Sequence, residues 1–189
     1  MLIDANARRK VSFLVPYLID ARTVLDFGCG DLAMDKALLS TLPDLQITGV
    51  DVVDFGIRDN RIDFLHYDGK KLPFANNAFD VSVAWHVFHH TKNPEKAFTE
   101  CLRVAKSRTI FVEPIWRYNL EIPGMMVMDW VFNIWKHRQI SMEFAFHSES
   151  WWRGLSEKYR GNVTDIRDVE LLPNFFPTGR SLLFVVEKH

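Results

Sequence analysis

The amino-acid sequence predicts an α/β fold: a doubly wound, mostly parallel sheet of seven strands with an antiparallel C-terminal hairpin. Short apolar, β-branched runs alternate with helix-like patterns from residue 23 to residue 113, which is typical of a parallel sheet flanked by helices. The first of these runs leads directly into a glycine turn and a helix. The last two runs are joined by a loop without a helical pattern, and such a loop favours antiparallel neighbours.

The elements are expected to follow one another through short connections. Strands are predicted at residues 23–27, 46–50, 62–66, 79–84, 109–113, 163–171 and 181–188. A first helix should begin after Asp4 and kink or end at Pro16, because proline removes a helical hydrogen bond. Further helices are predicted at about 34–42, 94–104 and 148–159, with Asn93 capping the second of these and Ser148 or Ser150 the third.

Composition places the chain among ordinary globular proteins. Its 189 residues predict one domain, 1–189, and the formal net charge of −1 gives no electrostatic footprint for nucleic acid. Cys29 and Cys101 match no metal-ligand spacing, so no metal site is predicted and both are expected to be reduced thiols. No signal-peptide pattern or bilayer-length apolar run is visible, and the expected location is cytoplasmic.

The glycine turn carries the main functional signal. Gly28 and Gly30 have no Cβ, so backbone N–H groups there can approach a ligand closely. A glycine turn can also serve only to allow a positive φ. However, Asp51 ends the next predicted strand about twenty residues later, where a carboxylate can accept hydrogen bonds from both ribose hydroxyls. Together these features predict a nucleoside-containing cofactor at the carboxyl ends of parallel strands.

With these motifs, the chain resembles the class I S-adenosylmethionine-dependent methyltransferases, in particular the small-molecule and quinone-biosynthesis-like branch. The resembling segments are 24–30, 49–51, 68–74, 79–90 and 94–104. Two departures are visible. Leu32 stands at the third glycine position of the first motif, and Lys106 to Arg108 lead directly into the fifth strand without the usual proline-glycine-glycine turn.

The resemblance implies S-adenosyl-L-methionine as the cofactor and a role for each matching residue. Gly28 and Gly30 would lie against its methionine part and ribose, above Asp26, which would hold the loop or receive the ammonium through water. Asp51 would take the ribose hydroxyls. The remaining cofactor-binding residues would be Val52 on the adenine face, Asp68 and Gly69 at the adenine amino group, and Trp85 beside the methionine.

Candidate acceptor-binding residues are His86, Trp116 and Trp130, and no catalytic residue is assigned. A structural role is favoured for His89 and His90, at the start of a helix, and a plain strand terminus for Glu113. Because the sulfonium already activates the methyl group, the reaction needs mainly positioning, and a base only if the acceptor must lose a proton.

Residues 115–147 are predicted as an insertion that covers the substrate. They are rich in Trp, Met and Phe. Three interpretations of the helical pattern at 122–138 remain open: a helix packed on the core, a lid over an apolar acceptor, or weak contact with a membrane interface.

The sequence therefore predicts a methyltransferase acting on a small, hydrophobic or aromatic acceptor. Two alternatives remain: a non-catalytic cofactor-binding or regulatory module of the same fold, and a nicotinamide-dependent oxidoreductase. The second is disfavoured because Tyr67 and Lys71 have dehydrogenase-like spacing but lie too early in the chain. Oligomeric state is not predicted.

Overall fold

The fold is described from a computed structural model, which defines residues 5–136, 143–169 and 180–188. One seven-stranded sheet has the strand order β3-β2-β1-β4-β5-β7-β6. The strands are β1 (Thr23–Phe27), β2 (Gln46–Asp51), β3 (Ile62–His66), β4 (Phe79–Trp85), β5 (Ala105–Ile115), β6 (Gly161–Asp168) and β7 (Arg180–Lys188). Asp4, the last two residues of the helical pattern at 122–138 and residues 172–179 of the loop between the last two predicted strands fall outside the described residues.

The predicted fold class is confirmed. β1 pairs in parallel with β2 and with β4, and β2 pairs in parallel with β3, whereas β6 and β7 are antiparallel. The strand order reverses between β1 and β4, where ligands of open α/β sheets usually bind. Within the described parts of the chain, no helix is long and apolar enough to cross a membrane.

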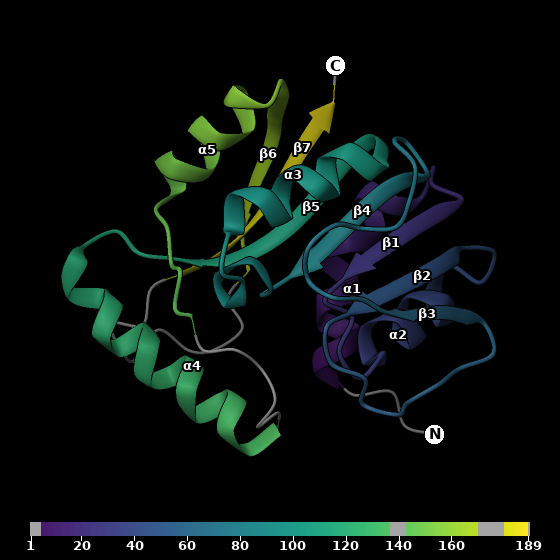
Figure 1. The fold of residues 1–189 in the computed structure, drawn as a ribbon, viewed down its shortest axis with the longest axis horizontal. Helices are drawn as coiled ribbons and strands as arrows, with labels where there is room; N and C mark the ends of the chain where they lie inside the picture. The colour runs from purple at the N-terminus through teal and green to yellow at the C-terminus, as the bar shows by residue number, and fades with distance from the viewer. Residues whose placement is uncertain (1–4, 137–142, 170–179, 189) are drawn as a thin grey trace. The chain divides into compact units, whose positions relative to one another are not determined.

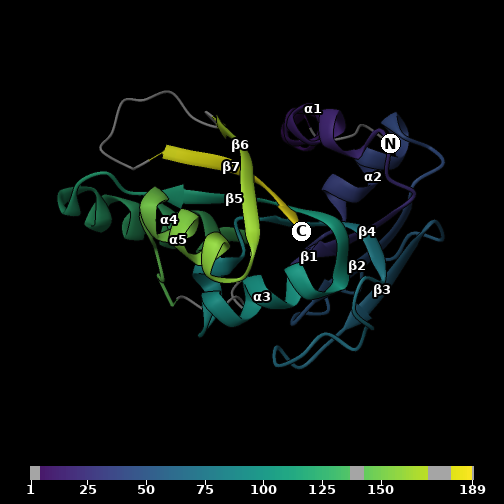
Figure 2. The ribbon, with the colours of Figure 1, turned by 90° about the horizontal axis from the view of Figure 1, so that it is seen from above.

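The chain divides into two compact units, and the first comprises Met1–Trp85 with Glu100–Ile110. In this unit α1 (Ala5–Leu18) and α2 (Ala33–Thr41) lie next to each other on one side of β1 and β2 (Figures 1 and 2). Their buried side chains pack on an apolar sheet face whose strands are almost entirely buried. α1 passes through Pro16 instead of ending there, because Leu14 and Leu18 remain buried on its apolar face.

The loop that leads from the glycine turn into α2 packs tightly against β2. A Cβ at Gly49 would lie 2.8 Å from Cys29 Sγ and 3.3 Å from Leu32 Cδ2, so only glycine allows this approach. Leu32 is fully buried and has a φ of 59°, in the left-handed region that favours glycine. The bulky residue at the third glycine position is therefore accommodated by burial of its side chain, at the expense of backbone strain.

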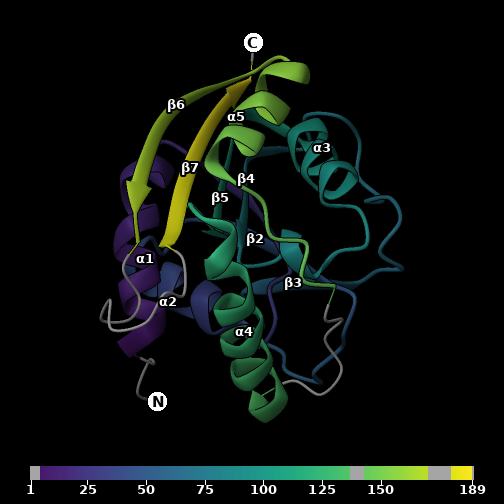
Figure 3. The same ribbon diagram turned by 90° about the vertical axis from the view of Figure 1, so that its left-hand side faces the viewer.

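The second unit comprises His86–Thr99 and Phe111–His189. It contains η1 (Phe88–His90), η2 (Asn119–Glu121), α4 (Ile122–Lys136) and α5 (Glu149–Lys158), and α3 (Pro94–Val104) begins in it. Its core is an aromatic cluster in which ring centroids lie 4.8–6.1 Å apart: Phe88, Phe98, Phe111, Trp152 and Phe184. The antiparallel pair β6 and β7 runs beside α5 (Figure 3).

Helix caps agree with the sequence, whereas several strand boundaries do not, and the starts of β5 and β6 show the reason. Asn93 Oδ1 accepts from Lys96 N at 2.9 Å, and Ser148, rather than Ser150, caps α5. β5 begins four residues earlier than predicted, because its polar start is bonded to β4: Ser107 Oγ donates to Asp80 O at 2.7 Å. β6 begins two residues early, at Gly161, which pairs with Lys188. Both differences depend on a partner strand that local sequence does not show.

In a helix interior an alanine variant is usually more stable than a glycine variant. Because Leu32 is strained, we expect the opposite order of stability at this position. Leu32→Ala and Leu32→Gly should both destabilise the protein, since losing a buried leucine costs roughly 2–5 kcal/mol. Glycine also relieves left-handed strain of about 1–2 kcal/mol, so the glycine variant should be the more stable of the two. Urea unfolding measures both free energies.

The matched control is Leu38, which is also fully buried but lies in the interior of α2. There the alanine variant should be the more stable by about 1 kcal/mol. The same order at both positions would mean that Leu32 is not strained.

Candidate functional site

The glycine turn lies at the carboxyl end of β1. Gly28 has a φ of 78° and Gly30 a φ of 55°. The N–H groups of Gly28 and Cys29 both donate to Val50 O, at 2.8 and 3.2 Å, which fixes the turn on β2. A Cβ at Gly30 would meet no atom within 4 Å, so the space above this glycine is open to a ligand.

Asp51 supports the turn from the end of β2. Its Oδ2 accepts from Gly30 N at 2.9 Å, and its Oδ1 accepts from Val53 N at 2.9 Å. The residue is half-buried, and each carboxylate oxygen has a second lone pair. The same carboxylate can therefore hold the glycine turn and accept hydrogen bonds from a ligand. The sequence pointed to the second role only.

The predicted adenine-side residues come together after β2 and β3. Val52 is 53% exposed, and a Cβ at Gly69 would lie 3.3 Å from its Cγ1. Asp68 is exposed, and the Lys70 backbone N–H, which donates to it at 3.0 Å, lowers the pKa of its carboxyl. This places an apolar side chain beside a glycine and an ionised acceptor, the set that a purine with an amino group would use.

A pair of buried carboxyl groups lies beneath the turn. Asp26 on β1 and Asp35 on α2 are 1% and 0% exposed and interact with each other. No other hydrogen-bond partner of either side chain occurs in the described part of the chain. Burial raises the pKa of Asp26 to about 6, and burial together with the Asp26 charge raises the pKa of Asp35 well above its usual value. Two such carboxyls can bond to each other only if one is protonated.

Two residues of this environment were missed by the sequence analysis. Lys10 on α1 lowers the pKa of Asp26 through its charge, and its Nζ lies 5.4 Å from the Trp85 ring centroid. Asp35 was seen only as part of a helix. The expected role of Asp26 in holding the loop is not borne out, since the turn is bonded to Asp51 instead. No local spacing marks Lys10 or Asp35, because α1 and α2 meet β1 through tertiary packing.

The second unit holds another titratable group, at the end of β5. Glu113 is buried; its Oε1 accepts from Val87 N and Phe88 N, and its Oε2 lies 2.6 Å from His89 Nδ1. Burial disfavours the charged His89 ring, but the negative charges of Glu113 and Asp129 outweigh this and raise the pKa of His89 to about 9. Glu113 is thus more than a plain strand terminus.

The three residues expected to contact the acceptor also lie in the second unit. His86 has a φ of 55°, and its Nε2 lies 3.1 Å from Ser181 Oγ. Trp116 Nε1 donates to Phe146 O at 3.3 Å. Trp130 on α4 is 51% exposed and lies with Met126, Val127 and Val131 on a partly exposed apolar surface. His86 and Trp116 thus have defined internal partners, whereas about half of Trp130 is exposed.

The residues of the first unit fit an adenosyl cofactor with a cationic part. Open space above Gly30, free lone pairs on Asp51, and a buried carboxyl pair without other partners supply the required acceptors. They lie at the point where the strand order reverses. The α/β fold and the arrangement of these residues are those expected for a nucleoside-containing cofactor.

Known methyltransferase structures share the fold. Geranyl diphosphate C-methyltransferase from Streptomyces coelicolor A3(2) gives a TM-score of 0.72 at 17% identity, covering 95% of this chain and 80% of its own. A SAM-dependent methyltransferase from Aquifex aeolicus gives 0.67 at 15% identity, covering 99% and 95%. Residues 25–112 match the family model described as "Methyltransferase domain". Residues 25–112 are therefore similar to a methyltransferase domain, and the fold is that of known S-adenosylmethionine-dependent methyltransferase structures.

Two relatives show the similarity in sequence. Demethylmenaquinone methyltransferase of Paenarthrobacter aurescens (strain TC1) is 38% identical over 36% of this chain and 34% of its own length. Malonyl-acyl-carrier-protein O-methyltransferase of Legionella pneumophila is 32% identical over 46% of this chain and 33% of its own. The match thus spans about a third of each curated relative's own length.

The Asp26–Asp35 pair should make stability fall as pH rises. The pKa values of both carboxyl groups are raised in the folded protein. The stabilisation that the protonated pair gives is therefore complete below the pKa of unfolded aspartate, about 3.9, and is lost as pH rises through about 6 and beyond. Asp35→Asn replaces the carboxyl group by an amide, which can donate a hydrogen bond to Asp26 and carries no negative charge. We expect this variant to be more stable than the wild type at pH 8, by on the order of 1–3 kcal/mol, and its stability to depend less on pH.

Urea unfolding between pH 5 and pH 8 tests this expectation. The matched control is Asp44→Asn, which removes an exposed carboxylate and should leave the pH dependence unchanged. A wild-type stability that rises steadily over this range would contradict the shared-proton interpretation.

Proposed function

We propose that this protein transfers the methyl group of S-adenosylmethionine to a small, hydrophobic or aromatic acceptor. One observation carries the proposal: Asp51 bonds both Gly30 N and Val53 N while its remaining lone pairs stay available at the edge of an open glycine turn. This arrangement suits a ribose whose two hydroxyls donate to one carboxylate.

In this proposal the first unit binds and orients the cofactor, whose sulfonium supplies an activated methyl group. Asp51 accepts from the ribose hydroxyls, and Val52 lies on the adenine face. Asp68 accepts from the adenine amino group. The methionine part extends along Gly28 and Gly30, with its ammonium near the negative pair of Asp26 and Asp35. Trp85 borders this part.

The acceptor is proposed to contact the second unit. Met126, Val127, Trp130 and Val131 of α4 are all more than a third exposed, although large apolar side chains are usually buried. Methionine adapts to irregular apolar ligands, and tryptophan supplies a large contact area. The name of one relative also favours this substrate class, since demethylmenaquinone is a quinone-type acceptor.

Cofactor binding is the first test of the proposal. S-adenosylhomocysteine should raise the melting temperature and NAD should not, because only a ligand of the native state stabilises it. Asp51→Ala should lower the affinity for S-adenosylhomocysteine on the order of 10- to 150-fold, by loss of hydrogen bonds to a charged group. Stability should fall as well, because Gly30 N and Val53 N lose their acceptor.

Asp63→Ala is the matched control, since it removes an exposed carboxylate from the neighbouring strand β3. Its affinity for S-adenosylhomocysteine should equal that of the wild type by calorimetry. Stabilisation by NAD instead of S-adenosylhomocysteine would refute the proposed function.

Acceptor binding by α4 is tested separately. Trp130→Ala should lower turnover with an apolar acceptor more than it lowers cofactor affinity. Leu120→Ala, which truncates an 89% exposed side chain just before α4, should change neither. Amide exchange at residues 120–136 should slow when S-adenosylhomocysteine and an apolar acceptor analogue are both present.

Exchange in α4 that is already as slow as in β1 and β4 without ligand would identify α4 as part of the core. Protection that appears only with lipid vesicles would favour the membrane-interface alternative instead. If no acceptor of any class leads to the formation of S-adenosylhomocysteine, the protein would be the non-catalytic module instead of an enzyme.

A further inference from the structure

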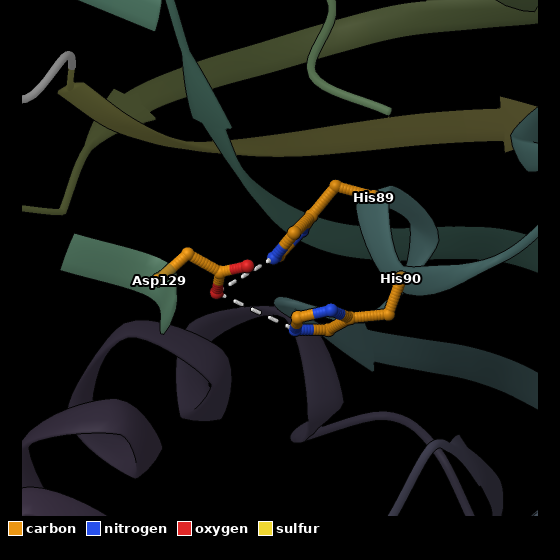
Figure 4. Close-up of side chains that lie close together, drawn as sticks. All are labelled: His89, His90 and Asp129. Carbon is orange, nitrogen blue, oxygen red and sulfur yellow. Dashed lines mark ion pairs between the residues drawn. The ribbon is translucent and has the colours of Figure 1, made fainter. Parts of the chain in front are cut away.

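Three side chains that could ligate a metal ion meet in the second unit. His89 and His90 extend from η1, and Asp129 extends from α4 (Figure 4). One ligand atom from each lies within 4.8 Å of the others. Asp129 is 39 positions or more from the two adjacent histidines and forms no motif with them, so sequence analysis predicted no metal site. They do not belong to the proposed cofactor site.

The separations within this cluster are too long for hydrogen bonds. His89 Nε2 and His90 Nε2 lie 3.5 and 3.6 Å from Asp129 Oδ1, whereas N–H···O bonds are about 2.7–3.2 Å long. A tetrahedral zinc ion with bonds of about 2.0–2.1 Å separates its ligand atoms by about 3.4 Å. The two measured distances therefore match the edges of a tetrahedral site better than direct bonds.

Glu113 orients the first histidine. It lies 2.6 Å from His89 Nδ1, and its other oxygen is held by Val87 N and Phe88 N. With Nδ1 occupied in this way, Nε2 points toward Asp129 (Figure 4). A carboxylate that receives the second ring N–H is the usual support of a metal-binding histidine. Phe146 stacks on the His89 ring with centroids 5.1 Å apart and shields it from solvent.

Asn133 holds the carboxylate in a similar way. Its Nδ2 donates to Asp129 Oδ1 at 2.8 Å and to Asp129 O at 2.9 Å, one helical turn away. Asp129 Oδ2 is buried and has no hydrogen-bond partner among the described residues. A buried carboxylate oxygen without a partner is costly, and a cation next to it would remove that cost. The cluster is thus supported from both sides and contains a carboxylate oxygen that a cation could satisfy.

We propose that His89 Nε2, His90 Nε2 and the Asp129 carboxylate bind one divalent transition-metal ion of the zinc type. Two imidazoles favour zinc and its neighbours over Mg²⁺ or Ca²⁺, which prefer oxygen ligands. Three protein ligands leave a fourth position for water or a ligand oxygen. The bound ion would join α4 to η1. This proposal does not depend on methyl transfer, and the competing occupant of the site is a proton on His89 Nε2.

Calorimetric titration of the metal-stripped full chain with Zn²⁺ at pH 8 tests the proposal. The wild type should bind one equivalent, and Zn²⁺ should raise its melting temperature, whereas Mg²⁺ at the same concentration should do neither. Asp129→Asn keeps the acceptor for Asn133 but removes the charge, and it should lower the Zn²⁺ affinity at least about 10-fold. His90→Gln should do the same by removing the second imidazole.

His66→Gln is the matched control, because His66 is an exposed histidine outside the cluster, and this variant should bind Zn²⁺ like the wild type. Circular dichroism should show that all variants are folded, and two independent ligand variants keep the test valid if one is not. Folded wild-type protein that binds no Zn²⁺ would assign the site to a proton and overturn the proposal. Equal affinity in the wild type, Asp129→Asn and His90→Gln would overturn it too, by showing that binding occurs elsewhere.

Discussion

The proposed cofactor site depends on the close packing of the glycine turn against Gly49 of β2. A Cβ at that position would fall within 2.8 Å of Cys29 Sγ, so any larger residue would push the turn away from the strand. The contact sets the height of Gly30 above Asp51, which bonds to its N–H at 2.9 Å. One carboxylate therefore fixes the turn and offers its remaining lone pairs in a single geometry. Preorganisation of this kind suits methyl transfer, where positioning supplies most of the catalysis.

Two structural features that destabilise the folded state lie next to this contact. Leu32 is held in a left-handed conformation, and Asp26 and Asp35 are buried together, which raises the pKa of both carboxyl groups. Such features persist only where the surrounding packing determines them, and they often lie at binding sites. Their position beneath the glycine turn connects stability with ligand binding: a cationic ligand group near Asp26 would relieve part of the electrostatic cost.

The second unit combines an aromatic core with a polar cluster at its edge. Phe88 packs in the core, while the next two residues, His89 and His90, face Asp129. Glu113 joins the two regions, because it ends a buried strand segment and accepts two backbone N–H groups as well as the His89 ring proton. The short helix η1 is therefore fixed from both sides. This rigidity is what a site for an ion requires, since ligand atoms must be held to within fractions of an ångström.

The sequence by itself determined the strand alternation, the glycine turn, Asp51, and the Asn93 and Ser148 caps, because each depends on local periodicity or on a short spacing. It also predicted a resemblance to methyltransferases, since several such segments occur in order, and residues 25–112 match a methyltransferase domain. Only the tertiary structure decided that Asp51 holds the turn, that Asp35 and Lys10 act on Asp26, and that His89 meets Glu113 and Asp129. The early starts of β5 and β6 were also decided only by the tertiary structure. Each joins residues that are distant in sequence, and burial, charge and pairing between such residues arise only when helices and strands pack.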